Sequence, residues 1–395
     1  MNAKLKGKML IGQSGGPTAV INQSLIGAII AAKSQENITG ILGAKHGIQG
    51  IMDEDFIDLS AYELAKLERI AITPAAALGS VRLKPGKAEC VRVFEVFKKH
   101  DIRYFFYIGG NDSAETAHII SEMAKEAQYD FCTVHIPKTI DNDLKVTDHC
   151  PGFASAAKFV AQAFMGDDRD NRALKGIKVN VVMGRHAGFL TAASALARQG
   201  DESRGPHLIY MPERAFDRAQ FQQDVRQVHA KWGRCVIAVS EGISDTEGTP
   251  ILSSNEKDSH GNVQLSGTGA LGDYLSALIK DAFSEPMRVR ADTFGYLQRS
   301  FPGVISEVDA QEARMVGTYG VEQAVQQASS GSVAIRRLSD KPYESDCFMT
   351  PLSSVAREST EMKDAWIHEN GHDITEDFLT YLTPLVGELP IVDEF

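Results

Sequence analysis

The stretch FCTVHIPKTIDNDL, residues 131–144, joins a strand-like run to a polar turn. Its first half is apolar and rich in β-branched residues, which is typical of a buried strand. Its second half places Lys138 three residues before Asp141, with Asp143 two residues further on. In a doubly wound parallel sheet, the turns at the carboxyl ends of the strands line the ligand crevice. The stretch therefore predicts a parallel strand that delivers one ammonium and two carboxylates to such a crevice.

The same order of apolar run, turn and amphipathic segment recurs along the chain. Sustained alternation of strands and helices predicts parallel sheets that are covered by helices on both faces. A length of 395 residues favours two such sheets over one. We therefore expect an α/β fold with two Rossmann-like, doubly wound domains and an active site in the cleft between them. The predicted helices cover residues 18–34, 113–127, 153–165, 187–198, 217–232, 269–283, 307–327 and 375–382.

Two segments do not follow this alternation. Residues 244–268 are rich in Ser, Gly, Asn and charged residues, which indicates an exposed loop or a mobile cover. Residues 339–361 are expected to be irregular. The sequence contains no repeat of fixed period and no low-complexity tract.

The composition excludes several classes of function. The chain is 43% hydrophobic and 24% charged, as in a large globular protein, and its net charge of −11 argues against nucleic-acid or anionic-membrane binding. No apolar run approaches the roughly 20 residues of a membrane span, and the run MLIG after Lys8 is too short for a signal peptide. Five scattered cysteines without a C-x-x-C pair favour a reducing cytosol, so we expect a cytoplasmic protein.

The first glycine turn has two interpretations. Gly15 and Gly16 allow the backbone to approach a ligand closely, and a helix from about Thr18 would present free N–H groups to an anion. An ordinary tight turn between a strand and a helix is the alternative. A Walker loop is excluded because no Gly-Lys-Ser/Thr follows, and the G-x-G-x-x-G nicotinamide fingerprint is also absent.

The second glycine turn, IGGNDS at residues 108–113, offers a metal ligand. Asp112 could hold Mg²⁺, which takes one or two carboxylates and completes its shell with water and phosphate. Alternatively, Asp112 or Ser113 caps a helix.

The later turns add a possible base and several cations. In the turn after residue 137, one carboxylate can accept a proton from a hydroxyl while the other holds metal or orients the first, and Lys138 balances phosphate charge. Arg185, at a strand end, is placed to brace a phosphoryl group, whereas His186 is expected to be structural. Arg288, Arg290, Tyr296 and Arg299 could clamp a phosphate, or they could form a solvated strand face.

Together these turns resemble the phosphofructokinase family in order and spacing. The P-x-T-I-D-N-D and M-G-R motifs are highly specific, and the resemblance extends over most of residues 12–299, with no usable motif in the last fifty residues. The motifs are GGPTAVIN (15–22), LGSVR (78–82), GGNDS (109–113), PKTIDND (137–143), MGRHAG (183–188), PE (212–213), EG (241–242) and GYLQRS (295–300).

The resemblance implies transfer of a phosphoryl group to the 1-hydroxyl of fructose 6-phosphate, with Mg²⁺ as cofactor. By motif position, Asp141 looks like the base and Asp143 its partner, and Arg185 looks like the residue that steadies the transferring group. Thr139 looks like a substrate or phosphate contact, and Arg82 lies near the donor. The sugar-phosphate pocket is expected to use Met183, Gly184, Glu241, Arg290, Tyr296 and Arg299.

Two positions indicate the phosphoryl donor. ATP-using members of the family usually have glycines where this chain has Asp112 and Lys138. A carboxylate at the first position would repel a nucleotide's inner phosphate, and an ammonium at the second could grip pyrophosphate. Both residues resemble the pyrophosphate-dependent branch, although Asn111 stands where that branch commonly has aspartate. We therefore expect a reversible, pyrophosphate-dependent phosphotransferase, with an ATP-dependent phosphofructokinase as the alternative.

The resemblance also implies domains and an assembly. Residues 1–152 with about 300–338 are expected to form the donor domain, and residues 153–299 with about 339–395 the sugar-phosphate domain. A homodimer or homotetramer is expected, in which Arg290 completes the neighbour's site; Lys175 and Lys178 stand where a second such arginine would be. A two-domain sugar-phosphate binding module is the alternative from a different class, but it would not need paired aspartates.

Overall fold

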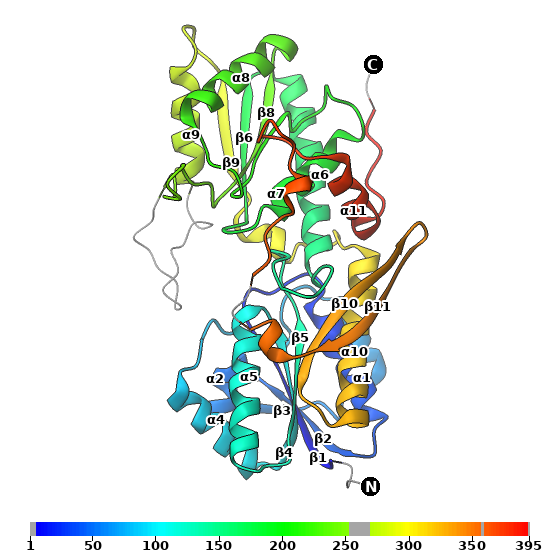
Figure 1. Cartoon of the computed structure of the whole chain (residues 1–395). Helices are drawn as coiled ribbons and strands as arrows, with labels where there is room; N and C mark the ends of the chain where they lie inside the picture. Colours follow the sequence, from blue (N-terminus) through cyan, green and yellow to red (C-terminus); the bar gives the residue numbers. More distant parts are fainter. Residues whose placement is uncertain (1–4, 253–268, 357–358, 394–395) are drawn as a thin grey trace. The chain divides into compact units, whose positions relative to one another are not determined.

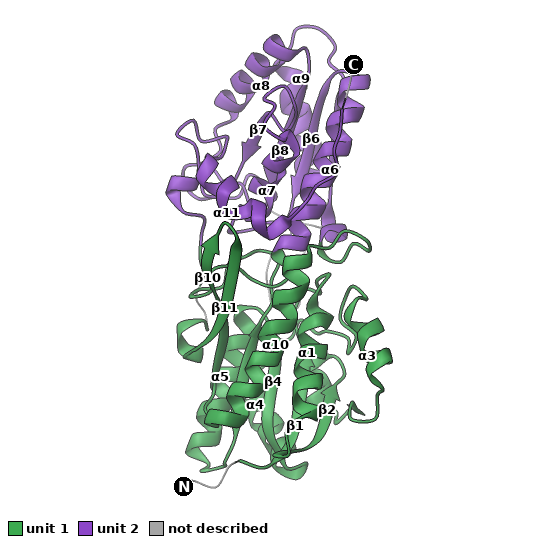
Figure 2. Cartoon of the chain, turned by 90° about the vertical axis from the view of Figure 1, so that its right-hand side faces the viewer, with its two compact units in different colours: residues 1–153, 299–360 green, residues 154–298, 361–395 purple. Residues whose placement is uncertain are grey.

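Two compact units make up the chain (Figure 1). The computed structural model describes residues 5–252, 269–356 and 359–393. Unit 1 comprises residues 1–153 and 299–360, and unit 2 comprises residues 154–298 and 361–395 (Figure 2). The chain therefore passes from one unit to the other three times.

Unit 1 contains a seven-stranded sheet with the strand order β11-β10-β5-β4-β1-β2-β3. The five inner strands are parallel, and the edge strands β3 and β11 are antiparallel to their neighbours. The chain runs from β1 outward to β2 on one side and returns to β4 on the other, so the strand order reverses at β1. The strands are β1 (Gly7–Gln13), β2 (Ile38–Ala44), β3 (Phe56–Asp58), β4 (Ile102–Gly109), β5 (Cys132–Pro137), β10 (Gly331–Asp340) and β11 (Tyr343–Thr350).

Both faces of this sheet are buried, and alternate residues of β4 show how. Tyr104 and Phe106 pack on the face that carries α1, α3 and α10, whereas Phe105 and Tyr107 pack on the face that carries α2, α4 and α5. This alternation follows from the two-residue period of a strand and explains why the run is apolar throughout. The helices are α1 (Ile21–Lys33), α2 (Gly47–Met52), α3 (Leu64–Ala71), α4 (Lys87–Lys99), α5 (Asn111–Glu126) and α10 (Glu307–Gln327), with the short 3₁₀ helix η3 (Leu352–Ser354).

Unit 2 contains a four-stranded parallel sheet in the order β7-β8-β6-β9. Val179 and Val181 of β6 face a core that includes Phe221 of α8 and Leu275 of α9. Asn180, between the two valines, points the other way and donates to Asp167 of α6 at 2.5 Å. The elements are β6 (Ile177–Val182), β7 (Leu208–Tyr210), β8 (Cys235–Ser240), β9 (Val289–Thr293), α6 (Phe153–Ala173), α7 (Phe189–Ala193), α8 (Arg218–Trp232), α9 (Ala270–Asp281), α11 (Glu376–Val386), η1 (Ser194–Arg198), η2 (Gly295–Arg299) and η4 (Asp364–Trp366).

The prediction that residues 339–361 are irregular is wrong. Strands β10 and β11 form an antiparallel hairpin that extends to residue 350, and β10 also pairs with β5. This pairing places residues 339–360 in unit 1 instead of the second domain, and residue 299 also belongs to unit 1. Of the expected loop 244–268, residues 253–268 lie outside the described part of the chain.

Several helix boundaries also differ from those expected. Helix α1 begins at Ile21, so the predicted helical start near Thr18 is wrong. The predicted helix at residues 187–198 is a short α-helix followed by a 3₁₀ helix, and α6 continues to Ala173. Among the described helices, none combines the length and hydropathy that a bilayer span requires.

Helices α1 and α10 cross at two glycines. A methyl carbon added at Gly27 would lie 2.4 Å from the Arg314 carbonyl oxygen, and one added at Gly317 would lie 2.1 Å from the Ser24 carbonyl oxygen. Real side chains do not approach a backbone oxygen so closely. The close crossing of these helices therefore requires glycine at both positions.

We expect Gly317→Ala to lower the melting temperature by several degrees, because an extra methyl group in a close-packed contact costs about 1–3 kcal/mol. Gly166→Ala is the matched control, since a methyl group there meets nothing within 4 Å and α6 would gain helix propensity. Calorimetry of both variants measures the effect. An unchanged melting temperature in Gly317→Ala would show that the two helices can separate without loss of stability.

Candidate active site

The turn after β1 is fixed by its neighbours. The Ser14 N–H donates to the Ile108 carbonyl oxygen of β4 at 2.9 Å, and the Gly15 N–H donates to the Val81 carbonyl oxygen at 3.1 Å. Gly15 has a φ of +75°, which glycine adopts far more readily than other residues. Residue 82, the predicted donor-site arginine, directly follows the residue that holds this turn. Because α1 begins five residues after Gly16, the start of this helix does not adjoin the glycine pair.

The Lys138 side chain lies against the same turn. It is 4% exposed, and its Nζ donates to the Gly16 carbonyl oxygen at 2.8 Å. A Cβ atom added at Gly16 would lie 3.1 Å from Arg299 Cζ, so the Arg299 guanidinium adjoins the same glycine. Burial, Arg299 and Arg82 lower the pKa of Lys138 to about 7. Three cationic side chains thus gather around the glycine turn, which is the charge pattern of an anion site.

The turn that follows β5 is held by its own side chains and by the segment that comes after it. The Asp141 N–H donates to Thr139 Oγ1 at 3.1 Å. Asn142 adopts a left-handed conformation with φ of +59°, and its Oδ1 accepts a bond from the Cys150 N–H at 2.9 Å. Asparagine tolerates this conformation better than most residues. The turn therefore holds Asp141 and Asp143 on either side of a pinned residue.

Asp143 is partly buried and lies near the Asp141 carboxylate. Burial and the neighbouring Asp141 raise the pKa of Asp143. Asn111 Nδ2 lies 3.4 Å from Asp143 Oδ2 and donates to Ser359 Oγ at 3.0 Å. Asn111 Oδ1 is buried, and it has no hydrogen-bond partner among the described residues. An unpaired amide oxygen beside a carboxylate pair is a suitable place for a hard cation.

Asp112, the predicted metal ligand, lies in the first turn of α5. Its Oδ1 is 3.3 Å from Lys84 Nζ, which also contacts Glu115 Oε2 at 2.8 Å. Neither Asp112 nor Ser113 caps the helix, since the N-cap residue is Gly110. No group of three or more His, Cys, Asp or Glu side chains with metal-ligand spacing occurs within the described ranges. Lys84 is not among the residues predicted from the sequence, although it lies only two residues after Arg82.

In unit 2, the loop that carries Arg185 is braced from β8. The Ser240 hydroxyl donates to the Gly184 carbonyl oxygen. A methyl carbon at Gly242 would lie 1.9 Å from the Arg185 carbonyl oxygen, so only glycine fits there. The carboxyl ends of β6 and β8 bring together the predicted residues Met183, Gly184 and Glu241. The Glu241 N–H donates to the Val182 carbonyl oxygen at 2.9 Å and so continues the pairing of the two strands.

Glu213 fixes the other end of this loop. Its Oε1 accepts bonds from the Gly188 N–H at 2.8 Å and from the Met362 N–H at 3.3 Å. Burial raises the pKa of Glu213, although three backbone N–H groups favour its ionised form. The sequence motif PE marked this residue without indicating what it does.

The remaining predicted residues of unit 2 lie on β6, on β9 and in η2, whose Gln298 Oε1 accepts a bond from the Met183 N–H at 3.3 Å. Arg290 is exposed on the edge strand β9, where its Nη1 donates to the carbonyl oxygen of Val289, and Tyr296 is 47% exposed in η2. Lys178 contacts Asp292 and lies 3.2 Å from Asp167.

The predicted site residues therefore form two groups. Unit 1 gathers Gly15, Gly16, Arg82, Lys138, Thr139, Asp141, Asp143 and Arg299 around the turns after β1 and β5. Unit 2 gathers Met183, Gly184, Arg185 and Glu241 at the ends of β6 and β8.

Glycine turns, a buried lysine with neighbouring arginines, and paired carboxylates at the carboxyl ends of parallel strands define an α/β enzyme that handles phosphate groups. A family model for phosphofructokinase matches residues 8–324. The chain belongs to the phosphofructokinase family.

The relatives share nearly the whole chain. The pyrophosphate–fructose 6-phosphate 1-phosphotransferase of Rhodospirillum rubrum is 54% identical over 386 residues, covering 97% of this chain and 95% of the relative. The enzyme of the same name from Xanthomonas campestris is 39% identical and covers 98% of this chain and 93% of the relative. The crystal structure of a pyrophosphate-dependent phosphofructokinase from Marinobacter aquaeolei is 34% identical, with a TM-score of 0.86 over 98% of this chain and 94% of that chain.

Proposed function

We propose that this protein reversibly transfers a phosphoryl group from pyrophosphate to the 1-hydroxyl of fructose 6-phosphate, with Mg²⁺, giving fructose 1,6-bisphosphate and phosphate. The observation that carries the proposal is the buried Lys138 ammonium, which contacts the Gly16 carbonyl oxygen beside the turn of Asp141 and Asp143. The names of the relatives support the same reaction.

The donor site is the group of cations in unit 1. Pyrophosphate is compact and highly charged, so Lys138 and Arg82 can neutralise it at close range. A bound polyanion would raise the pKa of Lys138 and keep its ammonium charged. Asp112, held by Lys84, presents a carboxylate at the start of α5 that would repel the inner phosphate of a nucleotide.

Asp141 is the general base. Asp143, whose pKa is raised by burial and by the neighbouring Asp141, is proposed as the partner carboxylate that orients this base. Phosphoryl transfer has a loose transition state in which the hydroxyl proton departs late, so a carboxylate of ordinary basicity suffices. The Thr139 hydroxyl orients the turn by accepting the Asp141 N–H.

The residues of unit 1 also fit Mg²⁺. Asn111 Oδ1 and the Asp143 carboxylate are hard oxygen ligands, whereas the Asp112 carboxylate contacts Lys84. We therefore propose Asn111 and Asp143 as the metal ligands in place of Asp112. Mg²⁺, when bound, would neutralise charge on the phosphoryl oxygens.

The unit 2 residues are proposed to bind the sugar phosphate. Met183, Gly184 and Glu241 would contact the sugar, and Arg185, whose loop Gly242 and Glu213 hold, would steady the transferring group. Tyr296, Arg290 and Arg299 would bind the 6-phosphate. Arg290 is exposed on an edge strand, where a second copy of the chain could meet it, so we also propose a homodimer or homotetramer with shared sites.

A cytoplasmic location is supported by the five free cysteines, all of which are described.

Asp141→Asn is expected to lower kcat at least about a hundredfold and to leave KM for fructose 6-phosphate within a few-fold, because removing a base acts on the transition state. Steady-state kinetics measures both constants. Asp130→Asn, which removes an exposed carboxylate shortly before β5, is the control and should match wild type. A normal kcat in Asp141→Asn would remove this residue from the role of base.

Wild-type protein is expected to prefer pyrophosphate to ATP by at least about two orders of magnitude in kcat/KM, which requires about 3 kcal/mol of differential transition-state binding. Formation of fructose 1,6-bisphosphate with each donor measures this preference. Asp112→Gly should admit some ATP because it removes the repelling carboxylate, whereas Lys138→Gly should mainly reduce pyrophosphate activity.

Glu122→Gln is the matched control, since Glu122 lies on the same helix and pairs with Lys125. It should leave the donor preference unchanged. A wild-type preference for ATP would favour the alternative function, an ATP-dependent phosphofructokinase. Failure of any donor to phosphorylate the sugar, with the sugar phosphate still bound, would favour the sugar-phosphate binding module.

Shared sites predict complementation between inactive variants. In a mixed dimer of Asp141→Asn and Arg290→Gln chains, one site keeps Asp141 from one chain and Arg290 from the other, so mixing should restore activity. Mixing Asp141→Asn with Arg185→Gln should restore none, because both residues are proposed to act from the same chain. Light scattering reports the assembly, and a fully active monomer would refute the proposal.

A further inference from the structure

The segment that follows the catalytic turn folds back beside it. The Thr139 N–H donates to the Pro151 carbonyl oxygen at 3.3 Å, and Asn142 Oδ1 accepts a bond from the Cys150 N–H at 2.9 Å. Residues 139–152 therefore form a closed loop. The position of Asp141 and Asp143 depends on what holds the returning segment, residues 149–152.

His149 is the centre of that anchorage. Its side chain is 1% exposed, its Nδ1 lies 2.8 Å from Asp148 Oδ2, and its Nε2 lies 2.6 Å from Glu312 Oε2 of α10. An ionised carboxylate can only accept hydrogen bonds, so a ring between two of them donates from both nitrogens. A ring that donates from both nitrogens is an imidazolium cation.

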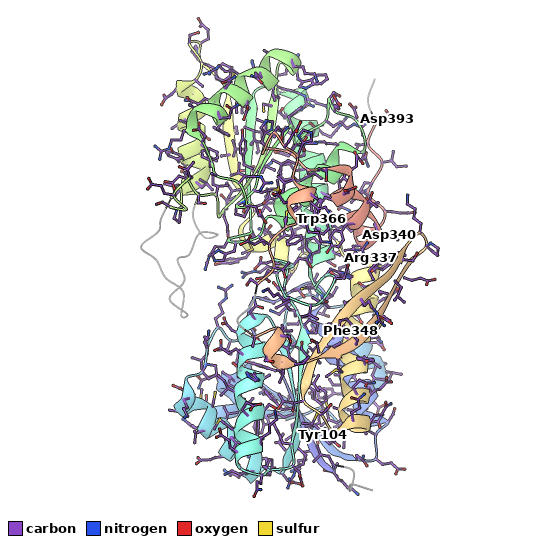
Figure 3. All side chains as sticks on the ribbon, in the orientation of Figure 1. Tyr104, Arg337, Asp340, Phe348, Trp366 and Asp393 are labelled. Atoms are coloured by element: carbon purple, nitrogen blue, oxygen red, sulfur yellow. The ribbon has the colours of Figure 1, made fainter. Side chains whose placement is uncertain are left out.

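Both carboxylates are held in turn by the hairpin β10–β11. Glu312 Oε1 accepts bonds from the Tyr343 hydroxyl and the Ser345 hydroxyl, each at 2.6 Å. Asp148 Oδ2 accepts a bond from Arg337 Nε at 3.1 Å, and Figure 3 labels Arg337 on this hairpin. Asp148 and His149 are therefore connected to helix α10 and to the hairpin β10–β11, which both lie far from them in the sequence.

Helix α10 holds the returning segment at a second point. Asp309 Oδ1 accepts a bond from the Gly152 N–H at 2.8 Å. Asp309 and Glu312 are three residues apart, which places them on one face of the helix. One helix face thus fixes both ends of residues 149–152.

We propose that His149 is a positioning residue for phosphoryl transfer, because its ion pairs with Asp148 and Glu312 hold residues 149–152 and, through them, the turn of Asp141 and Asp143. The inference rests on the proposed function of that turn. His149 itself touches no reacting atom in this role.

The protonated ring of His149 lies between two negative charges, those of Asp148 and Glu312. Arg337 also pairs with Asp148, but it is shared with Asp340, which lies 2.7 Å from its Nη1. Burial raises the pKa of Tyr343 above its ordinary value and that of Cys347 to about 12, so these groups near Glu312 stay neutral. Deprotonation of the ring would leave the buried Glu312 carboxylate and the partly buried Asp148 carboxylate without the cation that lies between them, which is costly.

The pH range follows from the same contacts. Burial disfavours the charged ring, but Glu312 and Asp148 prevail and raise the pKa of His149 to about 9. A group whose pKa is raised on folding stabilises the folded state fully at pH values below its ordinary pKa. This stabilisation is lost as the pH rises through the pKa of the folded state. The anchorage should therefore hold at neutral pH and fail near pH 9.

Glu312→Gln tests the proposal because it keeps the side-chain shape and removes one charge. The imidazolium should then lose its proton at lower pH. The alkaline limb of the pH profile of kcat should therefore shift to lower pH by at least about one unit, while the KM values for the phosphoryl donor and for fructose 6-phosphate stay within about twofold. Glu322→Gln is the matched control, since it lies ten residues further along α10, about 15 Å away. Its pH profile should equal that of wild type.

The assay uses whichever of pyrophosphate or ATP the wild-type chain accepts. An active wild type whose alkaline limb coincides with that of Glu312→Gln would overturn the role of His149 and leave the proposed function intact. A wild type that is inactive with both donors would overturn the proposed function and this inference with it. His149→Gln should reduce kcat at pH 7 at least about tenfold. If this variant does not fold, the pH profile of Glu312→Gln still tests the role of His149.

Discussion

The burial of the Lys138 ammonium is the constraint on which the phosphate site depends. A buried cation without a hydrogen-bond acceptor is unstable, and this one donates to the carbonyl oxygen of Gly16. The contact joins the turn after β1 to the turn after β5, two strands separated by β4 in the sheet. Any larger residue at Gly15 or Gly16 would meet Lys138 or Arg299. The glycine pair therefore allows two cations to approach one stretch of backbone, and the resulting excess of positive charge favours an anion.

Much of this could be predicted from the sequence because the relevant signals are local. Parallel strands with two buried faces are apolar throughout, which identified β1, β4, β5, β6 and β8, and the turns at their ends were read directly as motifs. The prediction of the phosphofructokinase family is confirmed by the family model and the relatives. The motif residues of unit 1 and those of unit 2 each lie together, as expected for turns at the carboxyl ends of neighbouring strands.

The features that were missed depend on contacts between distant parts of the chain. The end of β10 and strand β11 carry the charged residues Asp340, Glu344 and Asp346, which hide the strand pattern until the pairing of the two strands is known. Glu312 contacts His149 across 163 residues of sequence, and neither residue stands out in its own segment. Lys84 was overlooked because a lysine in a loop is usually a solvated charge, and only its contacts with Asp112 and Glu115 give it a role. The late start of α1 reflects residues 18–20, which are buried in an irregular conformation before the helix begins.

The three passages of the chain between the units affect how the protein can fold during synthesis. Residues 154–298, most of unit 2, form one continuous stretch, and all four strands of its sheet are made before the chain returns to unit 1. The sheet of unit 1 is still incomplete at that moment, because β10 and α10 have not left the ribosome. Strand β5 then has an open edge, and an unpaired strand edge is a template for association with other chains. A nascent chain is therefore most vulnerable to aggregation between the synthesis of β5 and that of β10, and chaperone contact is most valuable to it over that interval.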